Sequence, residues 1–356
     1  MKKPSENHLG CVLLLVLGVL ISGIAISGAL VLGRVREDVP VVISPLPTIT
    51  GLAPTATVAK ERPKLPTRAP ATATPEPFVE GATATPTSDA APTDTPGVPD
   101  TAWMKLPVLP KVSKNAKEIY ARGIANGTDP HSFSKIGDCQ SIRQYFIGIF
   151  DDPNAYHIGE YDYLSTTIDN FHGSYDRKSK AVQTGWNVAS PLSVLNTDPL
   201  ECKVNETPLE CEFRLHNPSI AIISMETWTK DRPISLYEDY LRQIVQFTVD
   251  RGVVPILATK ADNLEGNNAI NAAIARVAHD FDVPLWNFWR VVQPLPNHGL
   301  EADAFHLTND KDNFSDEKAM QAAWPNRNLT ALMALDVVWR AVTGQDPSGA
   351  VPPNGQ

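Results

Sequence analysis

The sequence predicts an α/β domain, and two observations support this fold class. Short apolar stretches with the composition of buried strands alternate along the chain with stretches of helical periodicity. The strand-like stretches are apolar throughout, which is typical of a parallel sheet covered by helices on both faces. We therefore expect a three-layer α/β/α sandwich with a mainly parallel sheet. In such folds the functional site lies beyond the carboxyl ends of the strands.

The individual elements follow from periodicity and from the residues that stop helices. Asn126-Gly127 marks the end of the first helix, and Gly252 marks the end of a long amphipathic one. The pattern predicts helices at residues 116–125, 141–150, 235–251, 267–281 and 329–342, and strands at 133–136, 219–225, 253–258 and 283–288.

The N-terminal region has the composition of a membrane anchor. Residues 11–32 are apolar or small without interruption by charge, and Lys and Arg residues flank them on both sides. At about 1.5 Å per residue, such a run crosses a bilayer core of about 30 Å. We predict a short tail at residues 1–10 and an uncleaved transmembrane anchor at 11–33. The alternative is a signal peptide cleaved near residues 25–27, although signal peptides have apolar regions of only about 7 to 15 residues.

The segment after the anchor, residues 34–102, is rich in Pro, Thr and Ala. This composition buries too little apolar surface to offset the entropy of ordering, so we expect a disordered stalk. Such a stalk is typical between a membrane anchor and an exported domain. We predict one folded domain at residues 103–344 outside the cytoplasm, on a single-pass membrane protein, followed by a disordered tail at 345–356.

Charge and motifs exclude several classes of partner and cofactor. The net charge is −9, and no cluster of Lys and Arg suits a phosphate backbone, so nucleic acid is not an expected partner. The sequence has no glycine-rich phosphate loop and no His-x-x-x-His spacing, so we expect neither a nucleotide cofactor nor a metal.

The cysteines beyond the anchor are Cys139, Cys202 and Cys211. Cys202 and Cys211 flank a short polar loop, and outside the cytoplasm we expect them to form a disulfide. Cys139 lies where a strand is expected to run into a helix. A thiol at that turn is exposed near free backbone N–H groups and is suited to be a nucleophile. The alternative is an inert buried thiol.

The residues around this turn resemble a known family. Gly137-Asp138-Cys139-Gln140-Ser141 is similar to the first sequence block of the SGNH (GDSL-type) hydrolases, in which Gly-Asp-Ser follows the first strand and the Ser is the nucleophile. Asp303-Ala304-Phe305-His306 resembles the family's Asp-x-x-His segment, which supplies the base and its orienting carboxylate. Gly185 resembles the block-two glycine, whose N–H helps to bind the oxyanion. The resemblance implies an SGNH/flavodoxin-like sandwich and ester hydrolysis.

The sequence departs from the family motifs at two positions, and both departures concern the activity and not the fold. Cys139 replaces the family's serine, and Glu226 follows a central strand in Ser224-Met225-Glu226-Thr227, where the family has a Gly-x-Asn-Asp block. Loss of one oxyanion donor typically costs about 100- to 1000-fold in rate. Asp138 is expected to cap the turn by accepting hydrogen bonds from free N–H groups, and Glu226 to lie at the site or its rim.

Two functional hypotheses remain from the sequence. In the first, the chain is a membrane-tethered ester hydrolase in which Cys139, His306 and Asp303 act on acyl groups of envelope or environmental carbohydrate. Asp138, Gly185 and Glu226 then line the site. In the second, a catalytically inactive SGNH-like domain binds a surface glycan or a partner protein.

Overall fold

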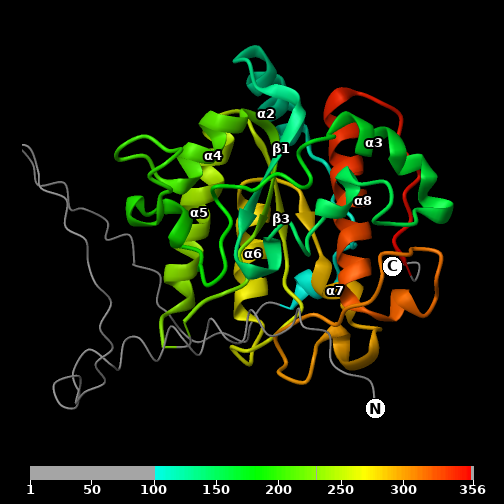
Figure 1. Ribbon diagram of the computed structural model, residues 1–356. Helices are drawn as coiled ribbons and strands as arrows, with labels where there is room; N and C mark the ends of the chain where they lie inside the picture. The colour runs from blue at the N-terminus through cyan, green and yellow to red at the C-terminus, as the bar shows by residue number, and fades with distance from the viewer. Residues whose placement is uncertain (1–100, 230, 354–356) are drawn as a thin grey trace, which may run out of the picture. The chain divides into compact units, whose positions relative to one another are not determined.

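The computed structural model describes residues 101–229 and 231–353. Within them, four parallel strands form one sheet in the order β1 (Asp129–Gly137), β2 (Pro218–Ser224), β3 (Val254–Ala258) and β4 (Leu285–Trp286) (Figure 1). Val182 forms an isolated parallel bridge with Gly137, on the side of β1 that β2 does not occupy. After β1 the chain first runs along one side of this strand, at Val182, and then forms β2 on its other side. The carboxyl end of β1 is therefore a topological switch point, where ligands bind in open α/β sheets.

Helices cover both faces of the sheet (Figure 1). One face carries α4 (Pro208–His216), α5 (Ile234–Asp250) and α6 (Ala269–Asp280), which contact β1 and β3. The other face carries α2 (Lys114–Ala125) and the long α8 (Ala323–Thr343), with the shorter α3 (Ser165–Asn170) and α7 (Phe288–Val292) packed on α8. The predicted α/β class with a parallel sheet is therefore confirmed.

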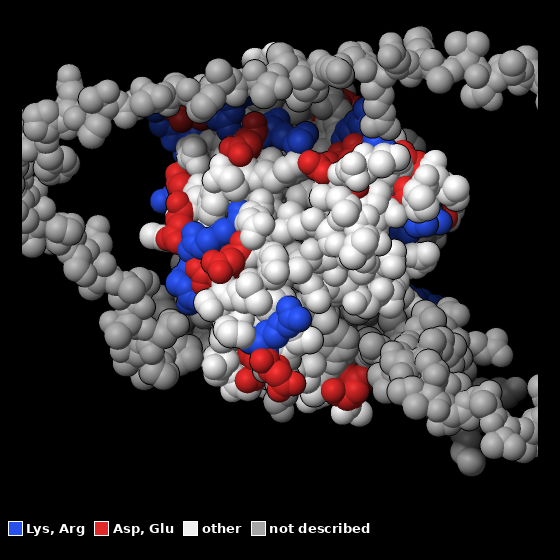
Figure 2. Space-filling model, turned by 90° about the vertical axis from the view of Figure 1, so that its left-hand side faces the viewer, with Lys and Arg blue, Asp and Glu red and all other residues white. Residues whose placement is uncertain are grey.

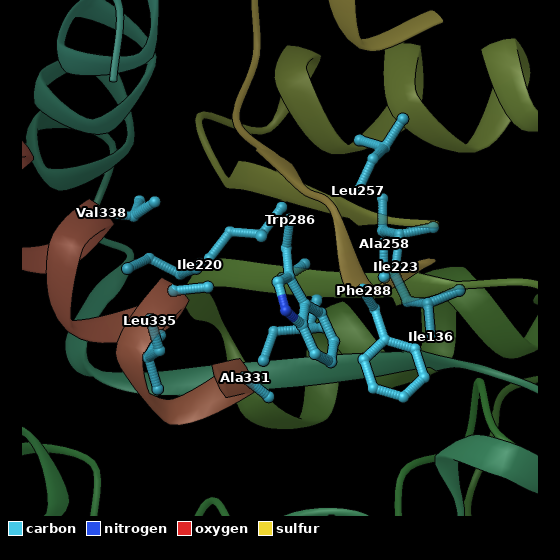
Figure 3. Packing of buried hydrophobic residues seen from close by; sticks show 14 of the residues in the cluster. Ile136, Ile220, Ile223, Leu257, Ala258, Trp286, Phe288, Ala331, Leu335 and Val338 are labelled. Atoms are coloured by element: carbon cyan, nitrogen blue, oxygen red, sulfur yellow. The ribbon is translucent and has the colours of Figure 1, made fainter. Parts of the chain in front are cut away.

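The core between the sheet and α8 is built around Trp286 at the end of β4. Figure 3 shows its indole ring among strand residues such as Ile220 and helix residues such as Leu335. Trp286 is fully buried, and its ring centroid lies 5.4 Å from that of Phe288. The indole Nε1–H donates to Thr330 Oγ1 on α8 at 3.3 Å, which satisfies the only polar atom of that side chain. A two-residue strand is thereby held firmly against the helix layer.

The helix predicted at residues 141–150 is wrong. The segment instead forms turns and two short 3-10 helices, η3 (Cys139–Ser141) and η4 (Gly148–Asp151). Ile147 has the left-handed φ of 50°, and its N–H donates to the side chain of Asn328 on α8 at 2.8 Å. This long-range hydrogen bond replaces a local helical one, so tertiary packing overrides the apolar periodicity.

Other predicted boundaries shift at their ends. The strand predicted at 283–288 is limited to Leu285–Trp286, because α7 already begins at Phe288 with Asn287 as its cap. The helix predicted at 329–342 begins earlier, at Ala323, with Pro325 in its first turn, where a missing N–H does no harm. The remaining 3-10 turns are η2 (Ala102–Lys105), η5 (Gly159–Leu164), η6 (Ser190–Leu192), η7 (Val194–Asn196), η8 (Pro296–Gly299) and η9 (Ala319–Gln321).

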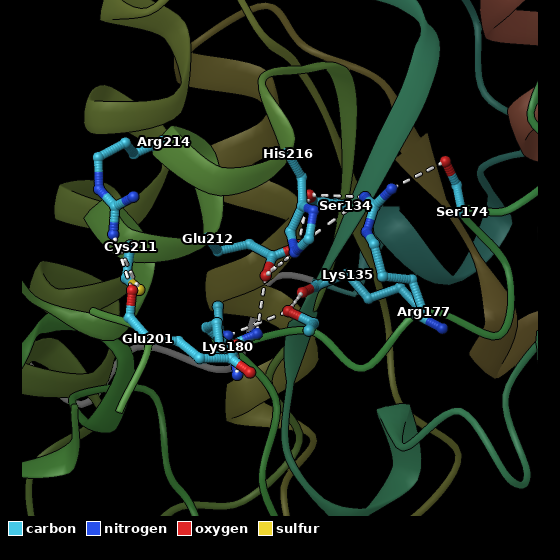
Figure 4. A network of polar contacts seen from close by, with 12 residues as sticks. Ser134, Lys135, Ser174, Arg177, Lys180, Glu201, Cys211, Glu212, Arg214 and His216 are labelled. Atoms are coloured by element: carbon cyan, nitrogen blue, oxygen red, sulfur yellow. Dashed lines mark hydrogen bonds and ion pairs between the residues drawn. The ribbon is translucent and has the colours of Figure 1, made fainter. Parts of the chain in front are cut away.

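The region from β1 to α4, both included, contains the predicted disulfide and a buried polar network. Cys202 and Cys211 are joined, with their Cα atoms 5.4 Å apart. In the network of Figure 4, the fully buried Glu212 on α4 accepts hydrogen bonds from Ser134 Oγ and Lys180 N, both at 2.7 Å. This carboxylate joins α4 to β1 and to the loop that leads to Val182. The network therefore holds α4 and this loop against β1, the strand that ends at the switch point.

On the face shown in Figure 2, acidic and basic side chains are interspersed and form no large patch of one sign. Surface pairs of this kind include Arg242 with Asp280 and Arg276 with Glu238, which join α5 to α6. Among residues 101–229 and 231–353, no helix has the length and apolar character needed to cross a bilayer. The predicted anchor at 11–33 and nearly all of the predicted stalk lie outside the described residues.

Candidate active site

The first part of the site is the turn that follows β1. A Cβ atom on Gly137 would lie 2.1 Å from Ser141 Oγ and 2.8 Å from the backbone oxygen of Ser224, so only glycine fits there. The next residue, Asp138, accepts from the N–H of Gln140 at 3.1 Å and caps η3, as predicted. The strand therefore turns sharply, and Cys139 begins the 3-10 turn at the edge of the sheet.

Asp138 also ties this turn to the segment after β2. Its Oδ2 accepts from the backbone N–H groups of Glu226 and Thr227, both at 2.8 Å. The side chain is fully buried, and burial raises the pKa of Asp138, opposed by these hydrogen bonds. Asp138 is therefore a structural brace that fixes the ends of two adjacent strands relative to each other.

Cys139 is the thiol at this turn. Its side chain is neither fully buried nor fully exposed, and it takes no part in the disulfide between Cys202 and Cys211. Glu206 lies close enough to those two sulfurs to suggest a metal site. The disulfide consumes both sulfurs, however, and Glu206 binds Arg214 at 2.6 Å, so these residues do not fit a metal ion.

The second part of the site is the loop that carries Asp303 and His306. Asp303 Oδ2 lies 2.5 Å from His306 Nδ1, and Asp303 Oδ1 accepts from the N–H groups of Phe305 and His306 at 3.0 and 2.9 Å. The loop can close on itself because Ala304 adopts a left-handed φ of 58°. The carboxylate thus holds both the backbone and the imidazole in one orientation.

This arrangement determines the protonation pattern of the imidazole. Partial burial raises the pKa of Asp303, but hydrogen bonds from His306 and the backbone outweigh it and hold the pKa below its ordinary value. An ionised Asp303 accepts a hydrogen bond from Nδ1–H of His306. In a neutral imidazole the other nitrogen, Nε2, then carries no proton and is an acceptor. Among the described residues, no group forms a hydrogen bond with the buried Nε2 atom. Nε2 is therefore available to take a proton.

Gln140 connects the two parts of the site. Its Nε2–H donates to the backbone oxygen of Phe305 at 3.2 Å, across 165 positions in the sequence. Gln140 follows Cys139 and Phe305 precedes His306, so this bond sets the distance between the thiol turn and the imidazole loop. Sequence reasoning missed this role. The sequence shows only that an amide side chain follows the candidate nucleophile, and its burial is known from the structure.

Gly185 lies in the loop that runs along the outer side of β1. It is the third residue of a turn closed by a hydrogen bond from Trp186 N to Gln183 O, with a φ of 81° that favours glycine. The bridge between Val182 and Gly137 places this turn at the same sheet edge as Cys139. Within the described part of the chain, the Gly185 N–H donates to no acceptor.

Glu226, predicted at the site or its rim, is almost fully buried at 1% exposure. Its Oε1 contacts Arg327 Nη2 at 2.5 Å and accepts from Ser224 Oγ at 2.9 Å. Arg327 is itself fully buried and lies over the rings of Phe146 and Phe288, at 4.9 and 4.7 Å. The side chain that stands where the family has an oxyanion-binding asparagine is thus directed to an internal cation.

A pocket of about 520 Å³ opens between the segments that follow β2 and β3. We call it the β2–β3 pocket. Its wall includes Glu226 and Trp228 after β2, Lys260 and Asp262 after β3, and Phe305 from the histidine loop. Because Phe305 borders His306, the pocket adjoins the Asp303–His306 pair. Lys260, Asp262 and Arg327 were not predicted, because nothing in the local sequence links them to the motif residues.

No protein-family model and no curated protein matches the chain. Solved structures similar to it include a protein from Desulfitobacterium hafniense DCB-2 described as lipolytic and of the G-D-S-L family, at 14% identity and a TM-score of 0.33, covering 57% of this chain and 99% of that one. Another is the lipase/acylhydrolase from Enterococcus faecalis, at 14% identity and a TM-score of 0.34, covering 62% of this chain and 99% of that one. The printed description of the first of these names the G-D-S-L family, whose sequence blocks residues 137–141 and 303–306 resemble.

Proposed function

We propose that the chain is a membrane-anchored, extracytoplasmic ester hydrolase in which Cys139 is the nucleophile, His306 the base and Asp303 the residue that orients the base. The observation that carries the proposal is the Asp303–His306 pair, whose Nε2 is left without a partner on a loop that Gln140 ties to the Cys139 turn. A nucleophile, a base and an orienting group in this order are the components of acyl transfer.

The reaction proceeds in two steps. The Cys139 thiol transfers its proton to His306 Nε2, and the sulfur attacks the ester carbonyl carbon to form a C–S bond. The alcohol leaves with the proton from His306, which gives a thioester on Cys139. Water, deprotonated by His306, then attacks the thioester, releases the acid and restores the thiol. The N–H groups of Cys139 and Gly185 are the donors for the negative oxygen in both steps.

The membrane assignment rests on the sequence of residues 11–33 and on the Pro/Thr-rich segment that follows. The disulfide between Cys202 and Cys211 supports a location outside the cytoplasm, because such bonds persist in oxidising compartments. Fractionation of cells that express the full chain, followed by protease treatment of intact cells, tests this part. Domain fragments released from the cell surface would support it, and a chain protected from protease would contradict it.

The alternative function is a binding domain without catalysis, and the burial of Glu226 favours it. The charge of Glu226 is directed to Arg327, so residue 226 supplies no oxyanion donor from its side chain. Under this hypothesis the Asp303–His306 pair is a structural hydrogen bond of the loop.

Hydrolysis of 4-nitrophenyl acetate by the full chain separates the two functions. We expect Cys139→Ala to lower kcat/KM by about 10³-fold or more, because the covalent step is lost. Cys11→Ala, which changes a cysteine of the predicted anchor, is the matched control and should retain activity. Mass spectrometry of the quenched reaction should find the acetyl group on Cys139. Equal rates for wild type and Cys139→Ala would assign the chain to the binding class.

Cys139→Ser adds a second readout on the same substrate. If the serine variant hydrolyses the ester and the wild type does not, the geometry of the site is intact and the nucleophile limits the reaction. If neither protein hydrolyses it, the ester-hydrolase proposal is wrong for this class of substrate.

A further inference from the structure

A second pocket, of about 460 Å³, lies along the side of β1 that β2 does not occupy, where Val182 pairs with Gly137. We call it the β1-edge pocket. Four of its lining residues are cationic, none is acidic, and five more carry a hydroxyl or an amide group. The cations are Lys135, Arg143, Arg177 and Lys178. In a chain with a net charge of −9, a wall of cations and hydrogen-bond donors is suited to a ligand with anionic oxygens.

Lys135 is the buried cation of this wall, at 2% exposure. Its ammonium group donates to the backbone oxygen of Tyr175 and forms no ion pair with any residue in the described part of the chain. Burial and the nearby Arg177 lower the pKa of Lys135 to about 7, although Glu212 and two other carboxylates oppose the shift. A buried charge normally has a partner of opposite sign. A bound anion would supply the partner that Lys135 lacks.

Lys178 and Arg143 are the cations that a ligand can reach. Lys178 is exposed, and among the described residues it forms no hydrogen bond and no ion pair. The Arg143 side chain is 40% exposed, and only its Nη1 atom is bound there, by Asp176 at 2.8 Å. Arg177 differs, because hydrogen bonds from both of its Nη atoms hold it to β1. Arg177 therefore adds charge from a fixed position, whereas Lys178 and Arg143 have unused donors.

The β1-edge pocket borders the two backbone N–H groups that we propose as oxyanion donors. Ser141 in its wall ends the short helix η3, which Cys139 begins. Thr184, also in its wall, directly precedes Gly185. The histidine loop lies toward the other side of β1, where it lines the β2–β3 pocket. The two pockets therefore lie on opposite sides of the Cys139 turn.

We propose that the β1-edge pocket binds an anionic group, a carboxylate or a phosphate, with Lys178 and Arg143 as its direct partners. Lys135 and Arg177 add positive charge from within the wall. Charge-assisted hydrogen bonds to such groups are about twice as strong as neutral ones, so the pocket selects acids over neutral molecules of the same shape.

The location of the pocket also assigns the anion to one half of the ester. In the reaction given above, His306 returns its proton to the leaving alcohol, so the alcohol lies beside the imidazole. The acyl half then extends to the opposite side, past Gly185 and into the β1-edge pocket. This placement rests on the proposed function, whereas the anion site itself does not.

Saturation-transfer NMR on the full chain with Cys139→Ala, at pH 7 and low ionic strength, tests binding apart from hydrolysis. The probes are adipate and butyl phosphate, with adipamide as the neutral counterpart. We expect transfer to at least one acid and none to adipamide. Lys178→Glu in the same background should raise the Kd of that acid about tenfold, because an attraction becomes a repulsion. Arg143→Gln should change the Kd in the same direction.

Lys111→Glu is the matched control for the charge reversal. Lys111 is an exposed lysine in the wall of a separate pocket of about 420 Å³, so its reversal changes the net charge of the chain equally. It should leave the Kd unchanged. Three results would overturn the anion site: no transfer to either acid, equal transfer to adipamide, or a Kd that neither Lys178→Glu nor Arg143→Gln alters.

A pair of esters tests the placement of the anion in the acyl half. Each is a 4-nitrophenyl ester whose acyl chain ends in the acid group that binds, or in its methyl ester; for adipate these are 4-nitrophenyl hydrogen adipate and 4-nitrophenyl methyl adipate. We expect kcat/KM about tenfold higher for the acid, through a lower KM, and loss of this preference in Lys178→Glu.

The outcomes separate the pocket from the hydrolase. Binding of an acid together with equal rates for the two esters would overturn the acyl placement. Binding of an acid without hydrolysis of either ester by the wild type would sustain the pocket and refute the hydrolase. Hydrolysis of both esters without binding of any acid would do the reverse.

Discussion

Two ion pairs near the carboxyl edge of the sheet differ in burial, and the difference separates structure from chemistry. The Glu226–Arg327 pair is completely enclosed, with both side chains 0% exposed. The Asp303–His306 pair has the same separation of 2.5 Å, but its side chains are 46% and 29% exposed. An enclosed pair cannot exchange protons with a substrate, whereas the Asp303–His306 pair is partly open to solvent. The difference favours a structural role for the first pair and supports the catalytic role that we propose for the second.

The largest expected effect comes from the exposed pair. His306→Ala should lower kcat/KM for 4-nitrophenyl acetate by about 10²- to 10⁴-fold, because a positioned general base is removed. The free energy of unfolding should change by less than about 0.5 kcal/mol, as expected at a site without core packing. Steady-state rates and urea unfolding of the same preparation check both.

His298→Ala is the control for this substitution. His298 is a nearby loop histidine whose Nδ1 lies 2.9 Å from the backbone oxygen of Gln293, so it shares the loop region and lacks a carboxylate partner. It should retain full activity. A His306→Ala protein that loses stability and keeps its activity would reverse the assignment of roles to the two pairs.

The enclosed pair should show the opposite pattern. Arg327→Met leaves Glu226 buried without its cation, and such a change typically costs about 3–5 kcal/mol. Adding Glu226→Gln should recover much of this loss, because the stranded charge is removed. Urea unfolding of the single and double variants measures both effects. The control is a surface pair on α2, Lys114–Glu118, whose side chains are 91% and 58% exposed. Glu118→Gln should not measurably change the free energy of unfolding.

If the double variant were less stable than Arg327→Met alone, the buried charge would not be the source of the loss. Packing of Arg327 against the rings of Phe146 and Phe288 would then explain it. The result would weaken the contrast between the two pairs without changing the role of His306.

The sequence predicted the Asp303–His306 pair and not the Glu226–Arg327 pair, for a physical reason. Asp303 and His306 are close in sequence and form a motif whose spacing reflects their contact. Glu226 and Arg327 lie 101 positions apart, and Arg327 precedes the predicted start of its helix at residue 329. A partner across the sheet leaves no local pattern, so Glu226 was visible only as a departure from the family block.

The fold was predicted on the same basis. Apolar strands such as β2 and β3 are buried on both faces, and their composition shows this directly. Residues 141–150 have a comparable apolar content, but the Ile147 N–H bonds to Asn328 far away in sequence. Local periodicity predicts elements whose hydrogen bonds are local. It fails where a distant side chain supplies the partner, as it also did for the bond from Gln140 to Phe305.

The smallest expected effect concerns Asp312, a partly buried carboxylate that has no cation partner among the described residues. Burial raises the pKa of Asp312 to about 6, and the hydrogen bond from Asn328 Nδ2 at 2.9 Å only partly opposes it. The unfolded chain ionises Asp312 at its ordinary, lower pKa, so the folded state binds more protons between about pH 4 and pH 6. The contribution of Asp312 to stability is therefore present below about pH 4 and is lost as the pH rises through about 6.

Asp312→Asn keeps an oxygen that accepts from Asn328 and removes the charge. The difference in unfolding free energy between the variant and the wild type should be near zero at pH 3.5 and should favour the variant by on the order of 1 kcal/mol at pH 7.5. Asp262, whose pKa burial also raises to about 6, has Lys260 beside it and contributes equally to both proteins, so it cancels in the difference. A difference that does not change with pH would show that Asp312 ionises at its ordinary pKa in the folded protein, and that the burial of this carboxylate has no cost.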